Sequence, residues 1–510
     1  MNEPPQSNGT PGRSLLELLG CAGLDAEVDR TADAVIITSL ADDSRRVQEG
    51  SCFVAVRGER CDGHGFLNDA VRRGARAVVV DKDDNQSLDA VRVRVHDTRE
   101  AIARLAAAYY GLRDERALRP RLIGVTGTNG KTTVAWLLRA ILQAAGYRVA
   151  LLGTVEYDLI DRRMQAPLTT PGPIDLCRHV ARARDAGADW AVLEVSSHAL
   201  QQRRTDGVSF SVGVFTNLSG DHLDYHGTMD RYWRSKRRLF EALGGDATAV
   251  INFDDPVGEL MASDLQATVL AFGIDSCLAD VRAVGEAPER RGTRFTVKTP
   301  SFEVDMLSPL VGRINVLNVV AATAAARTCS VAPEVIRRAV ETFSGVPGRL
   351  QRVSPPDGAF AVFVDYAHTD EALRHALEAV RPLTTGRLIC VFGCGGDRDR
   401  LKRPRMAAVV EHMADVAYVT SDNPRSEDPQ AIIDDILPGF GSRPRTRIEV
   451  EVDRRRAIET AIAEARTGDT VLITGKGHET YQLVGGQVLD FDDAKVARSC
   501  LYAAVPEGAS

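Results

Sequence analysis

The sequence predicts an α/β protein of three domains, and three observations carry that prediction. The chain has 510 residues, more than one ordinary domain holds. Short apolar runs with strand character alternate with helical segments along most of its length, a pattern typical of sheets covered by helices. The stretch VPGRLQRVSPPDG separates two such series, and its prolines and glycines suit a linker.

The elements, taken in chain order, give the expected domain limits. Residues 1–14 are polar and contain proline and glycine, so we expect a flexible tail. Residues 15–115 hold the strand-like runs AVIITSL, SCFVAVRG, ARAVVVD and VRVRVHD, with the helical GFLNDAVRRGA between two of them. From LRPRLIGVTG to VETFSG, within residues 116–345, strands and helices alternate, which predicts a mostly parallel sheet.

Residues 346–510 repeat this pattern in a third domain. The predicted strands are AFAVFVDY, RLICVFG, DVAYVT and TVLITG, and the predicted helices are EALRHALEAV, RMAAVVEHMA and AIIDDIL. Ligands of such sheets bind beyond the carboxyl ends of the strands. The residues that directly follow each strand are therefore the first candidates for a site.

Composition argues against several classes of protein. A formal net charge of −7 and a pI near 5.9 disfavour a dedicated nucleic-acid binder, although a local basic site stays compatible with them. The chain has no run of eighteen apolar residues and does not begin like a signal peptide, so we expect no membrane span. Nine scattered cysteines, an odd number, suit reduced thiols in the cytoplasm.

The loop TGTNGKTT, residues 126–133, lies between the predicted strand RLIGV and the helix TVAWLLRAILQAAG. Its glycines let backbone N–H groups curl around phosphate oxygens, Lys131 can neutralise phosphate charge, and Thr132 can bind magnesium. The strict pattern has glycine where this chain has Val125, so the loop is a variant, and a glycine turn without a ligand is the alternative. No Asn-Lys dipeptide, the usual guanine-reading pair, occurs, which favours ATP. We therefore expect a P-loop-type ATPase domain.

Polar residues follow the next two predicted strands. DWAVLEVSSHAL brings Glu194, Ser196 and His198 to the end of one strand, and FSVGVFTN leads into LSGDHLDYHG, which contains Asn217, Asp221, His222, Asp224 and His226. Oxygen ligands suit magnesium, so Glu194 is predicted to hold this ion directly or through water, with a capping or solvated carboxylate as the alternative. Further on, helical spacing in MDRYWRSKRRLF puts Tyr232 and Lys236 on one face with Leu239 and Phe240.

Seven motifs occur in the order found in Mur ligases: GVTGTNGKTT, LEVSSHAL, FTNLSGDHLDYHG, VDYAHT, VFGCGGDRD, DNPR and TGKGHE. From about Ala41 to Ala497 the chain resembles this family, and within it the members that add meso-diaminopimelate. The resemblance implies a first domain that holds a uridine nucleotide, a central domain that binds ATP, and a C-terminal Rossmann-like domain that brings the amino acid.

The resemblance also implies the reaction. ATP activates the D-glutamate carboxylate of UDP-N-acetylmuramoyl-L-alanyl-D-glutamate as an acyl phosphate, and the amine of meso-diaminopimelate attacks it to give an amide. Positioning and charge neutralisation matter more than a protein nucleophile in such phosphoryl transfer. The implied setting is peptidoglycan precursor synthesis in the cytoplasm, and we expect a monomer.

The resemblance assigns the ATP and metal sites residue by residue. The implied ATP loop is Gly127, Thr128, Asn129, Gly130, Lys131, Thr132 and Thr133. Lys131, Glu194, His222 and Lys236 form the implied catalytic set. Magnesium would be held by Thr132, Glu194, His222 and a carbamylated Lys236, because carbamylation turns a cation into an anionic oxygen ligand. Asn315 and Asn318 are implied near adenine, with helix-capping amides as the alternative. Arg349 and Asp365, with His368 nearby, are implied to reach ATP when the C-terminal domain closes; a strand-end turn is the alternative for Asp365.

The implied substrate residues fall in the first two domains. The uridine end would meet Asp42, Ser44, Glu59, Arg60 and Cys61, and the muramoyl-peptide end would meet Thr169, Thr170, Ser196, Gln202 and Arg204. The chain departs from the family pattern at Leu168, Gly220 and Gln351, where relatives often carry asparagine, a basic residue and glutamate.

The stretch SDNPRSED, residues 421–428, bears on which amino acid is added. Relatives that add diaminopimelate carry Asp-Asn-Pro-Arg here, and relatives that add lysine tend to lack the arginine. A guanidinium grips a carboxylate with two parallel hydrogen bonds, so Arg425 is expected to recognise the second carboxylate of diaminopimelate and to disfavour lysine, by roughly 10⁴-fold. The implied pocket comprises Arg398, Asp422, Asn423, Pro424, Arg425, Gly475 and Glu479. Glu427 and Asp428 are expected only to cap the next helix.

Three other interpretations stay open. The basic run of Arg398, Arg400, Lys402, Arg403 and Arg405 would suit nucleic acid, but it lacks interleaved aromatic residues. A folate-polyglutamylating ligase shares the phosphate loop, although DNPR, SSHAL and the N-terminal block argue against it. A nucleotide-dependent switch that transfers nothing would also use the loop.

Overall fold

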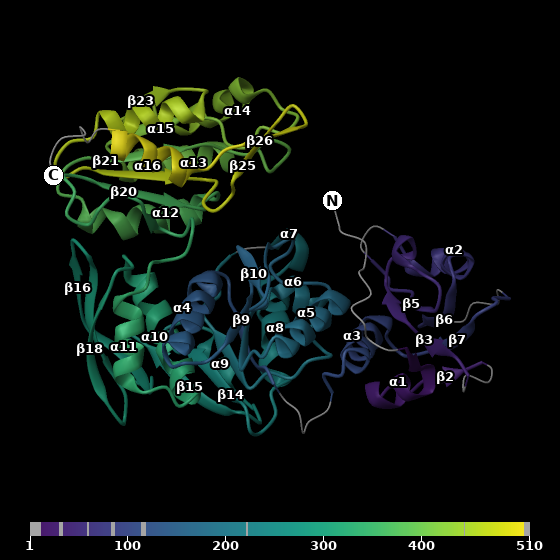
Figure 1. Ribbon diagram of the computed structural model, residues 1–510. Coiled ribbons are helices and arrows are strands. Elements are labelled where there is room, and N and C mark those ends of the chain that lie inside the picture. Colours follow the sequence, from purple (N-terminus) through teal and green to yellow (C-terminus); the bar gives the residue numbers. More distant parts are fainter. Residues whose placement is uncertain are drawn as a thin grey trace. The chain divides into compact units, whose positions relative to one another are not determined.

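The computed structural model of the protein describes residues 12–29, 34–58, 61–82, 87–113, 119–220, 223–442 and 444–503 (Figure 1). The chain divides into two compact units, each considered by itself below. The first comprises Met1–Ala279 with Ala324–Val331, and the second comprises Asp280–Thr323 with Ala332–Ser510. None of the helices in the described part of the chain is long and apolar enough to cross a bilayer.

The first unit begins with a small sheet. Its strands are β2 (Glu27–Val28), β7 (Val91–Arg94), β6 (Ala75–Val80), β5 (Ser51–Val54) and β4 (Ser39–Ala41), in that spatial order, and all but β2 run parallel. Helices α1 (Leu15–Ala22) and α3 (Thr98–Tyr109) share one apolar core with this sheet, and α2 (Leu67–Arg72) shares another. The predicted strands and helix of this domain are thus present.

Short elements complete this region. They are β3 (Ile36–Ile37) and the 3₁₀ turns η1 (Ser44–Arg46) and η2 (Gly63–Phe66). Most of the predicted tail lies outside the described residues, but Arg13–Ser14 forms β1, which pairs with β3. Arg13 and Ser14 therefore belong to a small sheet and not to a flexible tail, because they pair with Ile36 and Ile37.

The larger sheet of the first unit has the order β11-β10-β9-β12-β8-β13-β14-β15. In chain order the strands are β8 (Arg121–Thr126), β9 (Val149–Leu152), β10 (Glu156–Asp158), β11 (Arg163–Gln165), β12 (Trp190–Glu194), β13 (Val212–Phe215), β14 (Thr248–Asn252) and β15 (Thr268–Gly273). The last residues of β12, β8 and β13 are neighbours in the sheet, since Glu194 pairs with Val125 and Phe215 pairs with Thr126. Three chain segments therefore leave the sheet side by side at their carboxyl ends.

Helices cover this sheet. They are α4 (Lys131–Ala144), α5 (Pro173–Asp185), α6 (Ser197–Gln201), α7 (Leu223–His226), α8 (Met229–Glu241) and α9 (Gly258–Ala262). In α4 the buried Val134, Leu137, Leu138, Ile141 and Leu142 recur at helical spacing, so one apolar face meets the strands. Helices α5, α8 and α9 share an apolar core with the sheet.

The second unit opens with an antiparallel meander that the sequence prediction missed. It comprises β16 (Val281–Glu289), β17 (Gly292–Lys298) and β18 (Glu303–Ser308), with only two residues between the first two strands. The prediction of a mostly parallel sheet up to residue 345 is therefore wrong for this stretch, because so short a connection can join only antiparallel neighbours. Helices α10 (Arg313–Thr328) and α11 (Pro333–Glu341) follow.

The last sheet has the order β19-β20-β24-β21-β22-β23, and only β19 runs antiparallel to its neighbour. The strands are β19 (Gln351–Arg352), β20 (Ala361–Asp365), β21 (Leu388–Phe392), β22 (Val416–Val419), β23 (Arg447–Val450) and β24 (Thr470–Thr474). Both β21 and β24 are buried along their whole length, as expected of central parallel strands. All four strands predicted for this domain are present.

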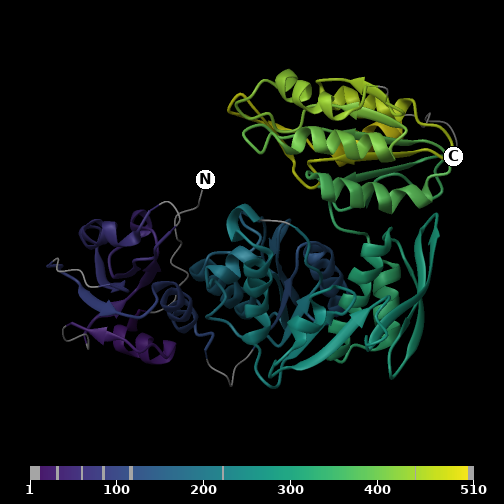
Figure 2. The same ribbon diagram turned by 180° about the vertical axis from the view of Figure 1, so that it is seen from behind.

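Helices cover both faces of this sheet. Helices α12 (Asp370–Val380), α13 (Lys402–Met413) and α14 (Pro429–Ile436) share one core with it, and α15 (Arg454–Ala463) and α16 (Asp493–Ala503) share the other. In the view from behind, α12 and α13 lie in front of the sheet (Figure 2). The turns η4 (Arg381–Leu383) and η5 (Leu437–Gly439) and the hairpin of β25 (Tyr481–Val484) and β26 (Gln487–Asp490) complete the unit.

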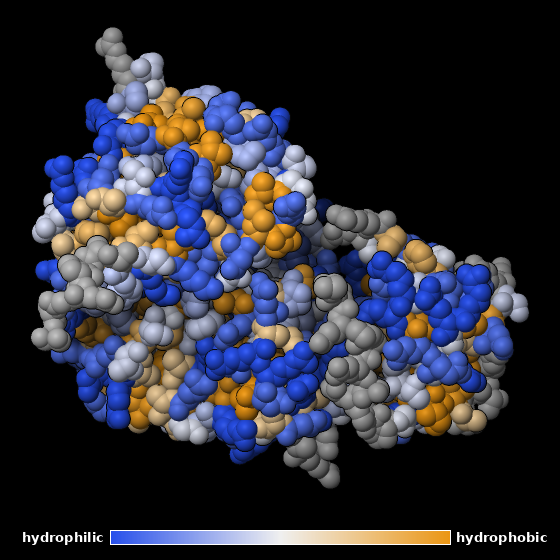
Figure 3. Space-filling view, turned by 45° about the horizontal axis from the view of Figure 1, so that its top comes forward, coloured by the Kyte–Doolittle hydropathy of each residue, from blue (hydrophilic) through white to orange (hydrophobic). Residues whose placement is uncertain are grey.

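The surface carries many charged side chains. In Figure 3, hydrophilic residues are spread across the face shown, and hydrophobic residues form small groups between them. This distribution agrees with the ordinary composition of the chain.

Candidate active site

The phosphate loop lies between β8 and α4, as predicted. Gly127 has a φ of +149°, and a Cβ there would lie 1.9 Å from Oγ1 of Thr216, so a larger residue cannot fit without displacing the neighbouring strand end. Gly130 is the N-cap of α4 with a φ of +87°. The glycines thus serve the turn itself, and the backbone N–H groups at the start of α4 form a typical anion-binding end of a helix.

Neighbouring segments hold the loop in place. Asn129 N donates to Oδ1 of Asn217 (2.9 Å), and the Asn217 amide returns a bond to Asn129 O (3.0 Å). Lys131 Nζ lies 2.9 Å from the carbonyl oxygens of both Gly127 and Thr128. The positive charge of Lys131 is therefore at the loop, where phosphate oxygens would bind.

Glu194 ends β12 beside the loop and is fully buried (0% exposed). Its carboxylate accepts from Thr132 Oγ1 (2.8 Å), from Thr154 N (2.8 Å) and from Thr154 Oγ1 (2.9 Å). These oxygen atoms suit magnesium, which keeps several waters and commonly uses one or two carboxylates together with substrate phosphates. In the described part of the chain no group of three or more His, Cys, Asp or Glu residues forms a metal site. His222 lies outside the described residues.

Lys236 lies on the buried face of α8, as its helical spacing predicts, together with Tyr232, Leu239 and Phe240. It is 1% exposed, its Nζ donates to Gly127 O (2.8 Å), and the ammonium lies 4.4 Å from the centre of the Tyr232 ring. The Tyr232 hydroxyl lies 3.1 Å from Thr128 Oγ1. The helix therefore brings a buried lysine directly to the phosphate loop.

The residues implied for the muramoyl-peptide end gather at the carboxyl end of β12. Thr170 Oγ1 donates to Glu194 O (2.8 Å) and accepts from Ser196 N (3.0 Å). Arg204 donates to Thr170 O (2.9 Å) and to Gln202 Oε1 (2.7 Å). Thr169 Oγ1 lies 3.2 Å from Thr154 Oγ1, which links the group to the Glu194 carboxylate. Leu168 is exposed, and its carbonyl oxygen accepts from the Tyr157 hydroxyl.

The residues implied for the uridine end are described only in part. Ser44 is buried at the start of η1, and Cys61 is exposed with its carbonyl accepting from Gly58 N (2.9 Å). Burial raises the pKa of Asp42, although Arg46 acts in the opposite direction. Glu59 and Arg60 lie outside the described residues.

The adenine-side candidates lie in the second unit. Asn315 donates to Val311 O (2.8 Å), and Asn318 donates to Asn315 Oδ1 (3.0 Å), so both buried amides hold the start of α10. These contacts agree with the alternative that the amides serve the helix end. Gly220 has no atom within 4 Å of a Cβ built on it.

Asp365 ends β20, where its carboxylate accepts from the N–H groups of Leu350 (2.6 Å) and Ala367 (2.8 Å). Burial raises the pKa of Asp365, and the Arg349 guanidinium acts in the opposite direction. Arg349 stacks on the Tyr366 ring at 4.9 Å. Gln351 Oε1 accepts from Gly348 N (3.0 Å), so this departure from the family pattern serves a turn.

A cluster of polar side chains lies at the carboxyl ends of β21, β22 and β24 in the second unit. Asn423 Nδ2 donates to Glu479 Oε2 (2.8 Å), and Asp422 is buried beside Gly475, where a Cβ would lie 2.8 Å from Asp422 Oδ2. Gly475 has a φ of +115°. Glycine is therefore needed at this position for two reasons, its backbone conformation and its lack of a side chain. The structure therefore brings together the implied residues from the DNPR and GKGHE motifs.

Sequence reasoning missed Lys476 in this cluster. It is 0% exposed, and its ammonium lies 3.1 Å from Asn423 Oδ1 and 3.4 Å from Glu479 Oε2. Burial lowers the pKa of Lys476, and Asp422 acts in the opposite direction. The signal was the lysine of GKGHE, a charged residue two positions after the fully buried strand β24.

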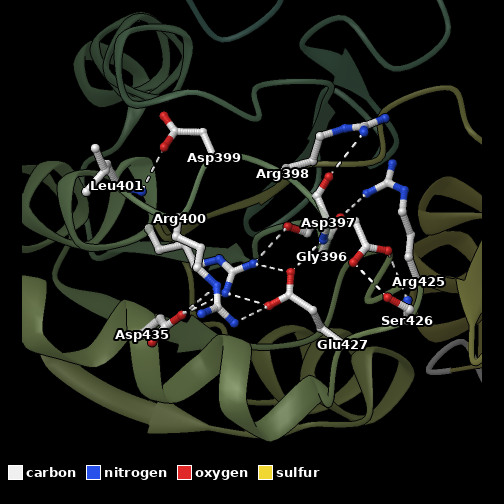
Figure 4. Close-up of polar contacts among 12 residues, drawn as sticks. Gly396, Asp397, Arg398, Asp399, Arg400, Leu401, Arg425, Ser426, Glu427 and Asp435 are labelled. Atoms are coloured by element: carbon white, nitrogen blue, oxygen red, sulfur yellow. Dashed lines mark hydrogen bonds and ion pairs between the residues drawn. The ribbon is translucent and has the colours of Figure 1, made fainter.

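Arg425 follows β22 with a φ of +54°, and Arg398 lies in the loop after β21 (Figure 4). Arg425 Nη1 donates to Gly396 O (2.7 Å), and Arg398 Nη1 donates to Asp397 O (3.2 Å). Pro424 is buried directly before Arg425. Figure 4 shows the two guanidinium groups on the same side of Asp397.

The acids that follow Arg425 divide into two roles. Asp428 caps α14 by accepting from Gln430 N (2.7 Å), as predicted. Glu427 is not a cap, and that expectation is wrong: its carboxylate binds Arg403 Nη2 (2.8 Å) and Arg400 Nη2 (2.9 Å) instead. The basic run that was compatible with a nucleic-acid site is thus largely engaged in internal contacts.

Comparison with known proteins identifies the family. Residues 36–110 match "Mur ligase family, catalytic domain", residues 125–326 match "Mur ligase middle domain", and residues 348–477 match "Mur ligase, glutamate ligase domain". A protein of Gloeobacter violaceus named UDP-N-acetylmuramoyl-L-alanyl-D-glutamate–2,6-diaminopimelate ligase is 44% identical over 495 residues, which cover 96% of this chain and 98% of the relative. The chain belongs to the Mur ligase family. It is therefore an ATP-dependent ligase that joins an acid to an amino acid.

Other relatives agree with this membership. A Bacillus cereus protein of the same name is 41% identical over 473 residues, covering 91% of this chain and 94% of the relative. A solved structure of a ligase of that name has a TM-score of 0.72 at 33% identity and covers 96% of this chain and 99% of its own. The predicted α/β architecture of three domains, with a central sheet domain and a C-terminal parallel sheet, is confirmed.

A more distant solved structure shares the fold alone. E. coli FolC in complex with DHPP and ADP has a TM-score of 0.56 at 21% identity and covers 79% of this chain. This likeness does not extend over the whole chain, and it gives no support to the folate alternative beyond the shared architecture.

Proposed function

We propose that this Mur ligase adds meso-diaminopimelate to UDP-N-acetylmuramoyl-L-alanyl-D-glutamate in peptidoglycan precursor synthesis. The observation that carries the proposal is Arg425 at the carboxyl end of β22, beside the buried Asp422 and Asn423, in a chain whose 44% identical relative bears the name of that activity. A guanidinium there meets a carboxylate that diaminopimelate has and lysine lacks.

The chemistry follows from the reacting groups. The D-glutamate carboxylate attacks the terminal phosphorus of ATP, forming an acyl phosphate and releasing ADP. The amine then attacks the acyl carbon, the new C–N bond forms, the C–O bond to phosphate breaks, and the amine loses a proton. Lys131 and the N–H groups of the loop neutralise and orient the phosphates, so the protein mainly positions the reactants.

Magnesium would be held at the loop by the oxygen atoms of Thr132 and Glu194. His222 and Lys236 as a carbamate complete the set that the family resemblance implies. When bound, the ion neutralises phosphate charge that builds up during transfer. Lys236 is suited to the carbamate role by position, because it is buried and lies at the carbonyl of Gly127.

We assign the substrates to the remaining candidates. Thr169, Thr170, Ser196, Gln202 and Arg204 would orient the muramoyl-dipeptide next to Glu194, and Asp42, Ser44, Glu59, Arg60 and Cys61 would meet the uridine end. Asn315, Asn318, Arg349 and Asp365 are proposed for ATP. Arg398, Asp422, Asn423, Pro424, Arg425, Gly475 and Glu479 would form the diaminopimelate pocket, with Glu479 taking the distal ammonium.

The proposed division of labour follows the sequence blocks. Residues 15–115 take the uridine nucleotide, residues 116–345 take ATP, and residues 346–510 take the amino acid. We further propose that the enzyme acts as a monomer in the cytoplasm, where ATP and the nucleotide-linked substrate are present together.

The test is an assay of ADP release with ATP, magnesium and the UDP-linked dipeptide, run with a panel of amino acids. Release that requires both the dipeptide and meso-diaminopimelate, with a product mass equal to their amide, is the expected result. Equal or better turnover with lysine would refute the specificity. ADP release independent of any amine acceptor would favour a nucleotide switch, and binding of folate without binding of the uridine nucleotide would favour the folate alternative.

A further inference from the structure

Two loops form one side of the proposed amino-acid pocket, and they leave neighbouring strands. The β21 loop comprises residues 394–399, and the β22 loop comprises residues 421–428. Strands β21 and β22 pair in parallel, with Phe392 opposite Val419, so both loops emerge at the same sheet edge. The first carries Arg398 and the second carries Arg425.

The two loops are docked through direct contacts (Figure 4). Gly396 N donates to Asn423 O (2.9 Å), and Arg425 Nη1 donates to Gly396 O (2.7 Å). Ser426 donates to the Asp397 carboxylate from both its N–H (3.2 Å) and its hydroxyl (2.7 Å). A Cβ on Gly396 would lie 2.0 Å from Pro424 O, so the backbones approach as closely as glycine permits. The position of each arginine thus depends on the opposite loop.

Glu427 is the residue on which this docking converges. Its carboxylate accepts from Asp397 N (2.5 Å), from Arg400 Nη2 (2.9 Å) and from Arg403 Nη1 and Nη2 (3.1 and 2.8 Å). Arg403 comes from α13, is 0% exposed, and also binds Asp435 (2.8 Å). The two arginines lower the pKa of Glu427 to about 2, so it is ionised at neutral pH.

Four hydrogen bonds occupy the acceptor positions that a carboxylate offers. Glu427 therefore has no acceptor left for an amino acid and cannot be a ligand residue. What it does instead is join the β22 loop to the β21 loop and to helix α13 at once. Its role is accordingly one of positioning.

Backbone conformation shows why such a clamp is needed. Asp397 and Arg425 have φ angles of +53° and +54°, a region that residues with a side chain occupy only when their surroundings hold them there. Glu427 binds the N–H of Asp397. Arg425 is held through its backbone, since Arg425 N donates to Leu483 O (2.9 Å) and Gly485 N donates to Arg425 O (2.7 Å).

We propose that Glu427 is a positioning residue for amino-acid selection: by clamping the β21 and β22 loops it sets Arg398 and Arg425 to receive one carboxylate. The ligand class is an α-amino acid with a second, distal carboxylate. This inference rests on the proposed function, because it takes the two arginines as part of the amino-acid pocket.

Glu427→Gln tests the clamp, because it keeps the size of the side chain and removes the charge that holds both arginines. We expect KM for meso-diaminopimelate to rise about tenfold or more, with KM for ATP and for the UDP-linked dipeptide within about twofold of the wild type. The ratio of kcat/KM for diaminopimelate to that for lysine should fall by about the same factor. Asp435→Asn is the matched control, since it removes the other carboxylate beside Arg403 (2.8 Å) and Arg400 (3.8 Å) and leaves the Glu427 carboxylate in place, and it should keep the ratio.

An unchanged ratio in well-folded Glu427→Gln would overturn the inference, as would an equal rise of all three KM values. If that variant does not fold, as judged by its thermal transition, Ser426→Ala takes its place. It removes only the hydroxyl bond to Asp397 and should lower the ratio about threefold; no change would likewise refute the clamp. Failure of the proposed function would look different, because the wild type itself would then show no turnover that depends on diaminopimelate.

Discussion

Replacing Arg425 by lysine isolates the contribution of the guanidinium fork to amino-acid selection. Lysine keeps the positive charge and tolerates the same backbone as arginine, so the loop should keep its conformation. Arg425 uses Nη1 on Gly396 O (2.7 Å), which leaves its other N–H groups to grip a carboxylate with two parallel bonds. An ammonium cannot reproduce that geometry. We therefore expect the variant to lose one of the two charge-assisted bonds.

Each such bond contributes about 1.5–3 kcal/mol. The loss corresponds to a fall in kcat/KM for meso-diaminopimelate of about 10- to 150-fold. The weak reaction with lysine should change by less than about threefold, because lysine has no carboxylate at that end. The ratio of the two kcat/KM values therefore falls by nearly the whole factor.

The assay measures ADP release at varied concentrations of each amino acid, with ATP and the UDP-linked dipeptide saturating. Arg405→Lys is the control: Arg405 is exposed, and its ion pairs with Asp370 and Asp399 are long, at 3.6 and 3.7 Å, so the ratio should not change. An unaltered preference in Arg425→Lys would refute the role of the fork. Equal losses with both amino acids would show that Arg425 serves the fold of the loop instead.

Three further predictions concern other groups. Lys236→Ala should lower kcat by about 10²-fold or more and abolish any response to added bicarbonate, whereas Arg234→Ala on the exposed side of the same helix should keep both; full retained activity would defeat the carbamate role. Arg454→Met leaves Asp493 buried without its partner, since both side chains are 0% exposed and bond at 2.6 and 2.8 Å. We expect a loss of about 3–5 kcal/mol and a drop in Tm of roughly 6–20 °C by calorimetry, with exposed Arg455→Met as the control. The pKa of Glu427 falls from 4.5 to about 2, so the stability that it contributes is complete above pH 4.5 and is lost as the pH falls towards 2. Denaturant titrations over that range should be less pH-dependent in Glu427→Gln, and an identical dependence would contradict the assignment.

The features that sequence predicted well are those fixed by local chemistry. The phosphate loop needs glycine at positive φ and a lysine at the start of a helix, and the eight consecutive residues of TGTNGKTT contain both. The same holds for Lys236, whose buried face follows from the spacing of Tyr232, Leu239 and Phe240. Buried strands such as β21 and β24 also stand out as continuous apolar runs.

What sequence missed depends on partners far along the chain. Glu427 lies directly before a helix cap and was expected to act as one, but its partners Arg400 and Arg403 are contributed by another loop and helix. Lys476 lies between two glycines in the sequence, and its burial depends on the fold, which places it against Asn423 and Glu479. The meander of β16–β18 alternates buried and exposed residues at a period of two, a signal of antiparallel pairing that the surrounding α/β pattern masked.

The close approach of Gly396 to Pro424 bears on how such an enzyme can change its amino acid. Because the β21 and β22 loops meet through backbone atoms and not only through side chains, neither can be reshaped alone without a collision. A change of specificity is therefore expected to require both loops as a single exchangeable module, and grafting one of them from a lysine-adding relative should yield a poorer enzyme than grafting the pair. Altered specificity would then require simultaneous changes in two segments that lie 22 residues or more apart, and not a series of independent point substitutions.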